Sequence, residues 1–427
     1  MGTRIRAVLK YSIVYCLCIV SFILLLLLGC CLPQSPIEQH LKESIPVLES
    51  EGNYPMVSEE VRTTRLDNHT EALILMESVS MNLAHPGFIL TNPLYVDGTA
   101  VDALRPFSES REEPTDYYVR YWQGFRFPVR LLLTFFSYSG IRTVLAVAFF
   151  GFALACFVII SRRLDLRSGF LFALSIALIN PHVVCRSLDY SCCFLLAFAA
   201  ILMMPFIIQT RKEYVFFFIL GMVTMFFDFY TVPLITLGYP LIFSLLLKTK
   251  EKPLWKESFF PLFIWLAGYA LSWIAKLGLT TVFTPVNGFA DGFRSFAERV
   301  GLAGNGNGAK AVGVADAFDN LWEVLFPETI NWVVFFIVIG YMMLSVMVLL
   351  LLHKNHKGNA RRYISLLLPL SYVLLWFVAT SGPIYFHSYF QYRSIAVLIW
   401  SGCMYYSLLF FPIRGRKRME STAMCNS

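Results

Sequence analysis

The sequence predicts an all-α polytopic membrane protein with about ten transmembrane helices and a large first extracytoplasmic loop. The 427-residue chain is 57% hydrophobic and 16% aromatic, and only 15% of its residues are charged, whereas a soluble domain carries about 25%. Long stretches carry no charge, and lysine and arginine gather at their ends. The formal net charge of +7 therefore indicates membrane orientation and not nucleic-acid binding.

Residues 1–32 predict a cytoplasmic N-terminus and a first transmembrane helix. Arg4, Arg6 and Lys10 precede an apolar run at 11–32, which is long enough to span a bilayer. Basic residues beside a span stay on the cytoplasmic side, so the chain that follows this helix is expected outside.

Residues 33–138 predict a domain-sized first extracytoplasmic loop with interfacial helices. The segment is polar and rich in Glu and Asp, and its apolar stretches are too short to span. Aromatic residues and arginines alternate at 116–130, a composition typical of the membrane interface. Loops of this length are usually functional.

Residues 139–412 predict the transmembrane bundle, with an outer loop at 280–329. We expect spans at 141–160, 169–181, 192–208, 215–227, 233–247, 259–279, 331–352, 364–380 and 395–411. Basic clusters occur at alternate loops and in the tail 413–427. This alternation predicts a multi-pass protein of the cell (inner) membrane with both termini in the cytoplasm.

Four sets of polar residues are predicted on the outer face: Asp67, Arg186 with Asp189, Asp228, and His387 with Tyr392 and Arg393. Ionisable groups near membrane depth usually face a cavity or one another, so their common face favours ligand binding there. Simpler roles stay open, because Asp67 can cap a helix, Arg186 can pair with Asp189, and the aromatic loop around His387 can anchor the interface.

Four short strings carry a resemblance to known proteins: LDNHTEAL (66–73), RYWQG (120–124), FDFYTVPLITLG (227–238) and HSYFQYR (387–393). The order of elements carries another: a first helix with its N-terminus inside, a large first outer loop with an acid and interfacial helices, and then many spans with short outer loops make the chain resemble the GT-C superfamily of membrane glycosyltransferases. It also resembles bacterial polytopic proteins of cell-surface polysaccharide clusters. It differs from the protein-mannosylating branch, in which Glu follows the first-loop Asp, because Asn68 stands here.

The resemblance implies a GT-C-like fold and transfer of a sugar from a polyprenyl-phosphate donor to a glycan, lipid or polymer acceptor at the outer membrane face. Asp67 matches the first-loop acid that acts as general base. Some members of the superfamily use a divalent metal ion and others need no cofactor. The residues expected to bind the donor phosphate, the substrate or such a metal are Arg393, His387, Tyr392, Arg186, Arg120, Asp228 and Asp189.

Two other functions stay open. A transporter or flippase of lipid-linked saccharides needs a polar path through the membrane, and Lys276 is the main charge inside a predicted span. A non-catalytic membrane assembly protein would use the first loop as a docking surface. The lipid bilayer is a partner under each hypothesis, and nucleic acid is a partner under none.

Overall fold

The computed structural model describes residues 2–85, 87–96, 98–110, 114–210, 212–228, 231–248, 255–300, 312–326, 363–411 and 413. Within these ranges the regular structure is helical, apart from one isolated bridge and a short antiparallel pair, β1 (Pro93–Leu94) and β2 (Asp116–Tyr117). The predicted all-α class is confirmed for this part of the chain.

In the described residues, five helical segments are long and apolar enough to cross a membrane. They are α1 (Gly2–Cys30), α7 (Tyr138–Arg163), α10 (Leu188–Thr210), α13 (Trp255–Phe283) and the run from α18 (Ser381–Gln391) through η3 (Tyr392–Ser394) to α19 (Ile395–Phe410). Shorter apolar helices are α8 (Leu166–Ala177), α11 (Glu213–Phe227), α12 (Leu234–Leu247) and η2 (Ile364–Leu366) with α17 (Leu367–Ala379). The protein is a helical membrane protein.

The number of spans stays a prediction. Every predicted span within the described residues coincides with an apolar helix. The span predicted at 331–352 and the tail at 414–427 lie outside the described residues.

The bundle is organised around α12, whose residues are all buried as far as Leu246, as expected for a helix that is apolar on every side. Beside it, α11 and α13 cross closely. A Cβ atom on Gly221 would lie 2.1 Å from the backbone oxygen of Trp265, and one on Gly268 would lie 2.2 Å from that of Phe218. Small residues allow membrane helices to approach in this way.

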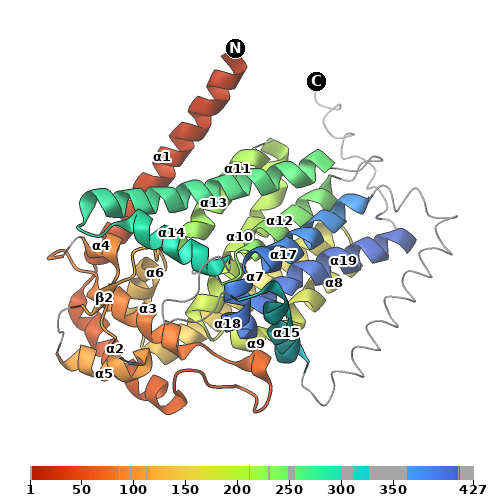
Figure 1. The fold of residues 1–427 in the computed structure, drawn as a ribbon. Coiled ribbons are helices and arrows are strands. Elements are labelled where there is room, and N and C mark those ends of the chain that lie inside the picture. Colours follow the sequence, from red (N-terminus) through yellow and green to blue (C-terminus); the bar gives the residue numbers. More distant parts are fainter. Residues whose placement is uncertain are drawn as a thin grey trace.

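The first predicted loop forms a helical domain with its own core. Its main helices are α2 (Gln34–Glu51), α3 (Asn68–Ser80), α5 (Ala100–Glu109) and α6 (Arg126–Leu133), and its shorter ones are η1 (Arg62–Thr64) and α4 (Phe88–Thr91). Apolar side chains of the four main helices pack together and against the start of α7. Figure 1 shows this N-terminal domain at the end of the bundle that α1 reaches from its N-terminus. We call this end the cavity side.

Four more short elements complete the cavity side: α9 (Pro181–Val184), α14 (Gly288–Arg299), α15 (Val314–Leu325) and the kinked α18. In its described residues, the outer loop predicted at 280–329 therefore contains the helices α14 and α15. Within α18, His387 has non-helical backbone angles (φ −126°, ψ 27°). This kink turns the helix where it borders the cavity described next.

Candidate functional site

A cavity of about 520 Å³ lies between the N-terminal domain, α14 and α18, within the size range of ligand pockets. Charged and polar side chains are numerous in its wall. They include Asp67, His69, Thr70, Glu77, Arg120, Asp189, Thr231, Ser295, Glu298, Arg299, His387 and Gln391. Of the residues predicted from the sequence, Asp67, Asp189, His387 and Arg120 are thus brought together around one space.

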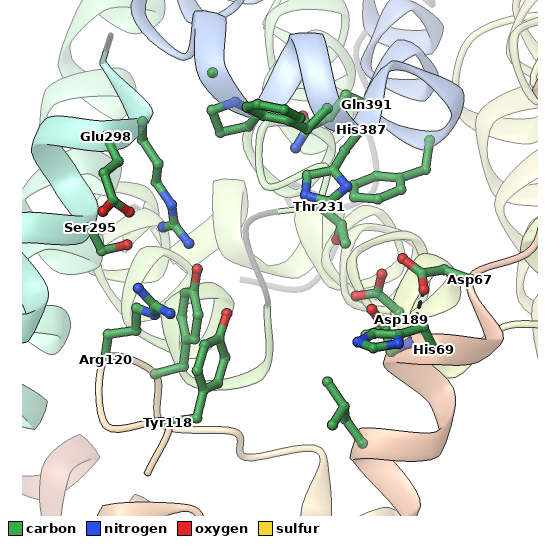
Figure 2. Close-up of a pocket in the computed structure, with 18 of the residues that line it drawn as sticks. Asp67, His69, Tyr118, Arg120, Asp189, Thr231, Ser295, Glu298, His387 and Gln391 are labelled. Carbon is green, nitrogen blue, oxygen red and sulfur yellow. Dashed lines mark hydrogen bonds between the residues drawn. The ribbon is translucent and has the colours of Figure 1, made fainter. Parts of the chain in front are cut away.

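One wall of the cavity, which we call the basic wall, carries Arg120 and Arg299 together with a single acid, Glu298. Figure 2 shows Arg120 and Tyr118 on the same side as Ser295 and Glu298 of α14. The guanidinium of Arg120 lies 4.5 Å from the centre of the Tyr118 ring, and that of Arg299 lies 5.0 Å from the centre of the Tyr121 ring. Burial lowers the pKa of Arg299 to about 10, so it stays cationic at neutral pH. Planar guanidinium groups suit phosphate oxygens.

The opposite wall is acidic and begins with Asp67 (Figure 2). Its Oδ1 accepts a hydrogen bond from the backbone N–H of Thr70 at 2.9 Å, which makes Asp67 the N-cap of α3. Its Oδ2 accepts one from the hydroxyl of Tyr389 on α18, at 3.1 Å. The side chain of Asp67 therefore both caps α3 and faces the cavity.

Asp189 stands beside Asp67 at the start of α10. The residue is 3% exposed, and within the described chain its buried Oδ1 has no hydrogen-bond partner. A buried carboxyl oxygen without a partner is costly. Such a group in a cavity wall is a strong candidate for contact with a ligand.

His69 adds a hydrogen-bond donor to the acidic wall. The backbone N–H of Ala100 donates to its Nδ1 at 3.2 Å, so the proton of the neutral ring is on Nε2. Burial lowers the pKa of His69, and the nearby Asp67 opposes this effect. The ring is therefore neutral at pH 7 and can donate through Nε2.

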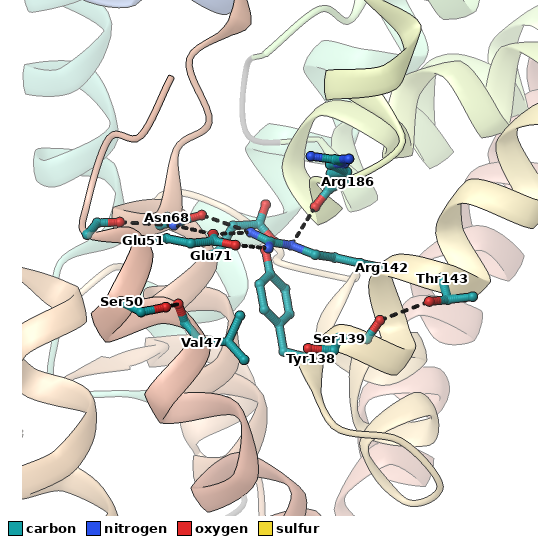
Figure 3. Close-up of polar contacts among 11 residues, drawn as sticks. Val47, Ser50, Glu51, Asn68, Glu71, Tyr138, Ser139, Arg142, Thr143 and Arg186 are labelled. Atoms are coloured by element: carbon teal, nitrogen blue, oxygen red, sulfur yellow. Dashed lines mark hydrogen bonds and ion pairs between the residues drawn. The ribbon is translucent and has the colours of Figure 1, made fainter. Parts of the chain in front are cut away.

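A buried polar network holds this wall against the bundle (Figure 3). Glu71 accepts hydrogen bonds from Tyr138 Oη (2.7 Å), Ser187 Oγ (2.6 Å) and the backbone N–H groups of Leu188 (3.1 Å) and Asp189 (3.2 Å). One carboxylate thus joins α3 to α7 and to the N-terminus of α10, where negative charge is favourable.

A second connection lies next to it. Arg142 of α7 forms a bidentate ion pair with Glu51 of α2, at 2.6 and 2.8 Å, and donates to Oδ1 of Asn68 at 3.2 Å. Asn68 also donates to Glu51 at 2.9 Å. Together with the Glu71 network, these bonds fix the start of α3 against α2, α7 and α10. They therefore also fix the position of Asp67.

The other predicted residues lie outside the cavity wall. Asp228 lies behind it, where its Oδ1 accepts from Thr231 N (3.0 Å), Thr231 Oγ1 (2.8 Å) and Cys193 Sγ (3.3 Å). Its role in the structure is to hold the wall residue Thr231.

Tyr392 and Arg393 directly follow α18, in η3. Arg393 is buried, donates to the backbone oxygens of Thr63 and Tyr389, and lies over the ring of Tyr190 at 4.3 Å. Tyr392 donates to the backbone oxygen of Ile179 at 3.1 Å. Both therefore support the cavity through η1 and the α8–α9 turn and are not part of its lining.

Arg186 points away from the network in Figure 3 and is exposed at the turn before α10. It is not among the residues that line the cavity. Its backbone oxygen accepts a hydrogen bond from Arg142 Nε at 3.2 Å. Arg186 therefore lies outside the cavity, whereas Asp189, with which it was predicted to act, lines it.

Lys276 is buried inside α13 and does not line the cavity. Its Nζ donates to the backbone oxygen of Leu90 and, at 3.0 Å, to Oγ1 of Thr280. The lysine therefore fastens α13 to the N-terminal domain.

Glu77, which we did not predict, is expected to make the stability of the protein depend on pH. Burial raises its pKa to about 8, although Arg126, Gln123 and Lys276 oppose the shift. Between the ordinary value of 4.5 and 8, the folded state keeps a proton that the unfolded state has released. The free energy of unfolding should therefore fall by about 1.4 kcal/mol per pH unit as pH rises through this window.

Melting in detergent between about pH 6 and pH 8 checks this. Glu77→Gln cannot ionise and keeps an oxygen for Gln123 Nε2, which donates to Glu77 at 2.9 Å, so the slope should become shallower. The exposed acid Glu43 provides the control, and Glu43→Gln should melt like the wild type. Parallel curves for Glu77→Gln and the wild type would contradict the prediction.

Sequence reasoning missed Arg299, Ser295 and Glu298 because they belong to a loop that we did not expect to be helical. It missed Glu77 although the residue follows Thr70 and Leu73 at helical spacing, so that all three share the cavity face of α3. That spacing was the available signal.

The described residues contain no group of three or more His, Cys, Asp or Glu side chains placed to hold a metal ion. No protein-family model, curated protein or solved structure matches this chain. The function of the site therefore has to be inferred from its own geometry.

Proposed function

We propose that the protein is a GT-C-like membrane glycosyltransferase that moves a sugar from a polyprenyl-phosphate donor to an acceptor hydroxyl. One observation carries this proposal: Asp67 and Asp189 line the same cavity as Arg120 and Arg299, and Figure 2 shows the two acids on the opposite side from Arg120. A sugar linked to a phosphate has hydroxyl groups at one end and negative charge at the other. The two walls complement these two ends.

In this reaction the acceptor oxygen attacks the anomeric carbon while its proton moves to a carboxylate oxygen of Asp67. The bond between the anomeric carbon and the phosphate oxygen breaks, and polyprenyl phosphate leaves. Arg120 and Arg299 stabilise the charge that develops on the leaving phosphate, the kind of interaction that lowers reaction barriers most. Attack and departure on opposite faces of the carbon invert its configuration.

The distribution of basic residues along the chain supports a site that faces the outside of the membrane. The cavity side carries the N-terminal domain, which follows the first span and its basic N-terminal flank. By the positive-inside rule this side lies outside the cell membrane. The donor would then be a lipid of the outer leaflet, as the GT-C resemblance implies, and the full set of about ten spans belongs to the same proposal.

A transfer assay tests the proposal. Purified protein in lipid nanodiscs is given polyprenyl-phosphate monosaccharides labelled in the sugar, with glycan and lipid acceptors. We expect release of polyprenyl phosphate with each sugar transferred. Replacing both Arg120 and Arg299 with Ala should lower kcat/KM for the donor by about 10²-fold or more.

Arg105→Ala is the matched control, because Arg105 belongs to the N-terminal domain like Arg120, is exposed and does not line the cavity. It should leave transfer unchanged. Movement of the labelled donor between leaflets without release of polyprenyl phosphate would instead identify a transporter. Absence of both turnover and donor binding would refute the transferase.

A further inference from the structure

Helix α14 presents three distinct faces. Gly288, Gly292 and Ser295 are buried at positions i, i+4 and i+7. The two glycines allow the helix to fold back on α13, because Cβ atoms there would lie 2.8 and 2.7 Å from atoms of Leu277. This packed face ends at Ser295, which also lines the cavity together with Glu298 and Arg299.

The second face is aromatic and the third is polar. Phe289, Phe293 and Phe296 recur at i, i+4 and i+7, and the rings of Phe289 and Phe293 stack at 6.3 Å. On the other flank, Asp291, Arg294 and Glu298 recur at i, i+3 and i+7, with Arg294 paired to Asp291 at 3.2 Å. A helix with one aromatic and one charged face is typical of the membrane interface.

The aromatic face is exposed, and it continues the surface of a membrane span. Phe293 is 60% exposed and Phe296 is 45% exposed. At the adjoining end of α13, Val282 is 73% exposed and Phe283 is 70% exposed. Because α13 is apolar and long enough to cross the bilayer, the apolar side chains exposed at its end are suited to contact lipid, and the aromatic face of α14 continues that surface.

Trp273 of α13 links this face to the basic wall of the cavity. Its ring centre lies 6.4 Å from those of Phe293 and Phe296. Its indole N–H donates to the backbone oxygen of Arg120 at 3.0 Å. Tryptophan concentrates at the boundary between acyl chains and water, where its ring is in lipid and its N–H finds a polar partner.

We propose that α14 lies in the membrane interface on the cavity side, with Phe289, Phe293 and Phe296 inserted among the phospholipids of that leaflet. The occupant of the aromatic face is a glycerophospholipid, whose headgroup phosphate reaches Arg294 on the polar flank. Both cavity cations then lie at headgroup depth, Arg299 through its own helix and Arg120 through Trp273. This inference depends on the membrane character of the protein and not on the transfer reaction.

Photo-crosslinking tests this placement. The full chain carries p-benzoylphenylalanine in place of Phe293 or, separately, Phe296, and is reconstituted in vesicles of phosphatidylethanolamine and phosphatidylglycerol. After irradiation, mass spectrometry of the α14 peptide should show a phospholipid adduct. The same probe in place of Glu109, an exposed residue at the end of α5, is the control and should give about tenfold less adduct.

The placement is overturned if the adducts at 293 and 296 do not exceed the Glu109 level. It is equally overturned if the probe crosslinks to residues 327–362 of the same chain, or to a second copy, in place of lipid. Each variant is first matched to the wild type in melting temperature, so a misfolded sample does not count as a negative. Because the readout is a lipid adduct, it stands or fails independently of sugar transfer.

Discussion

Replacing Asp67 with Asn is expected to lower kcat for sugar transfer by about 10²- to 10⁴-fold, the contribution of a general base. The amide oxygen of Asn can still accept from the N–H of Thr70, and its NH2 group can donate to the hydroxyl oxygen of Tyr389, so both contacts of Asp67 keep a partner. Since Asn caps helices as well as Asp does, the fold should survive. The measurement is single-turnover transfer together with a melting curve.

Asp165 provides the matched control. It caps α8 as Asp67 caps α3, with its Oδ1 accepting from the N–H of Ser168 at 2.7 Å, but it does not line the cavity. Asp165→Asn should leave transfer unchanged. If Asp67→Asn transfers normally and Asp189→Asn does not, then Asp189 is the base and our assignment is wrong.

Glu71→Ala is expected to destabilise the protein by about 3–5 kcal/mol, the largest structural effect that we foresee. The substitution leaves the hydroxyls of Tyr138 and Ser187 and two backbone N–H groups buried without their acceptor. Burial raises the pKa of Glu71, and these donors counteract the shift. Equilibrium unfolding in mixed detergent measures the loss.

Two comparisons define the outcome. Glu71→Gln keeps one accepting oxygen for these donors and should therefore lose less stability than Glu71→Ala. It should still lose part, because its amide nitrogen cannot accept. Glu43→Ala removes an exposed acid on α2 and should have almost no effect. A Glu71→Ala variant as stable as the wild type would show that the network does not hold α3 to α10.

The part of the site that could be predicted is the part encoded by neighbours in sequence. Asp67 follows from its place before an apolar helical stretch, and the shared side of Asp189 and His387 follows from counting spans. Arg299 could not be predicted, because its position depends on two glycines that let α14 fold back on α13. The structural roles of Arg393 and Tyr392 could not be predicted either, because their hydrogen-bond partners, the backbone oxygens of Thr63 and Ile179, are remote in sequence.

The sequence by itself determined the membrane class, the helical composition, the domain-sized first loop and a helix start with its N-cap at Asp67 or Asn68. These follow from local hydropathy and from short-range spacing, which act within one helix or one span. Only the tertiary structure decided which charges meet. Asp67 and Arg299 are separated by most of the chain and come to face one cavity, because buried networks and close helix crossings, which no single segment encodes, hold α3 and α14 in place.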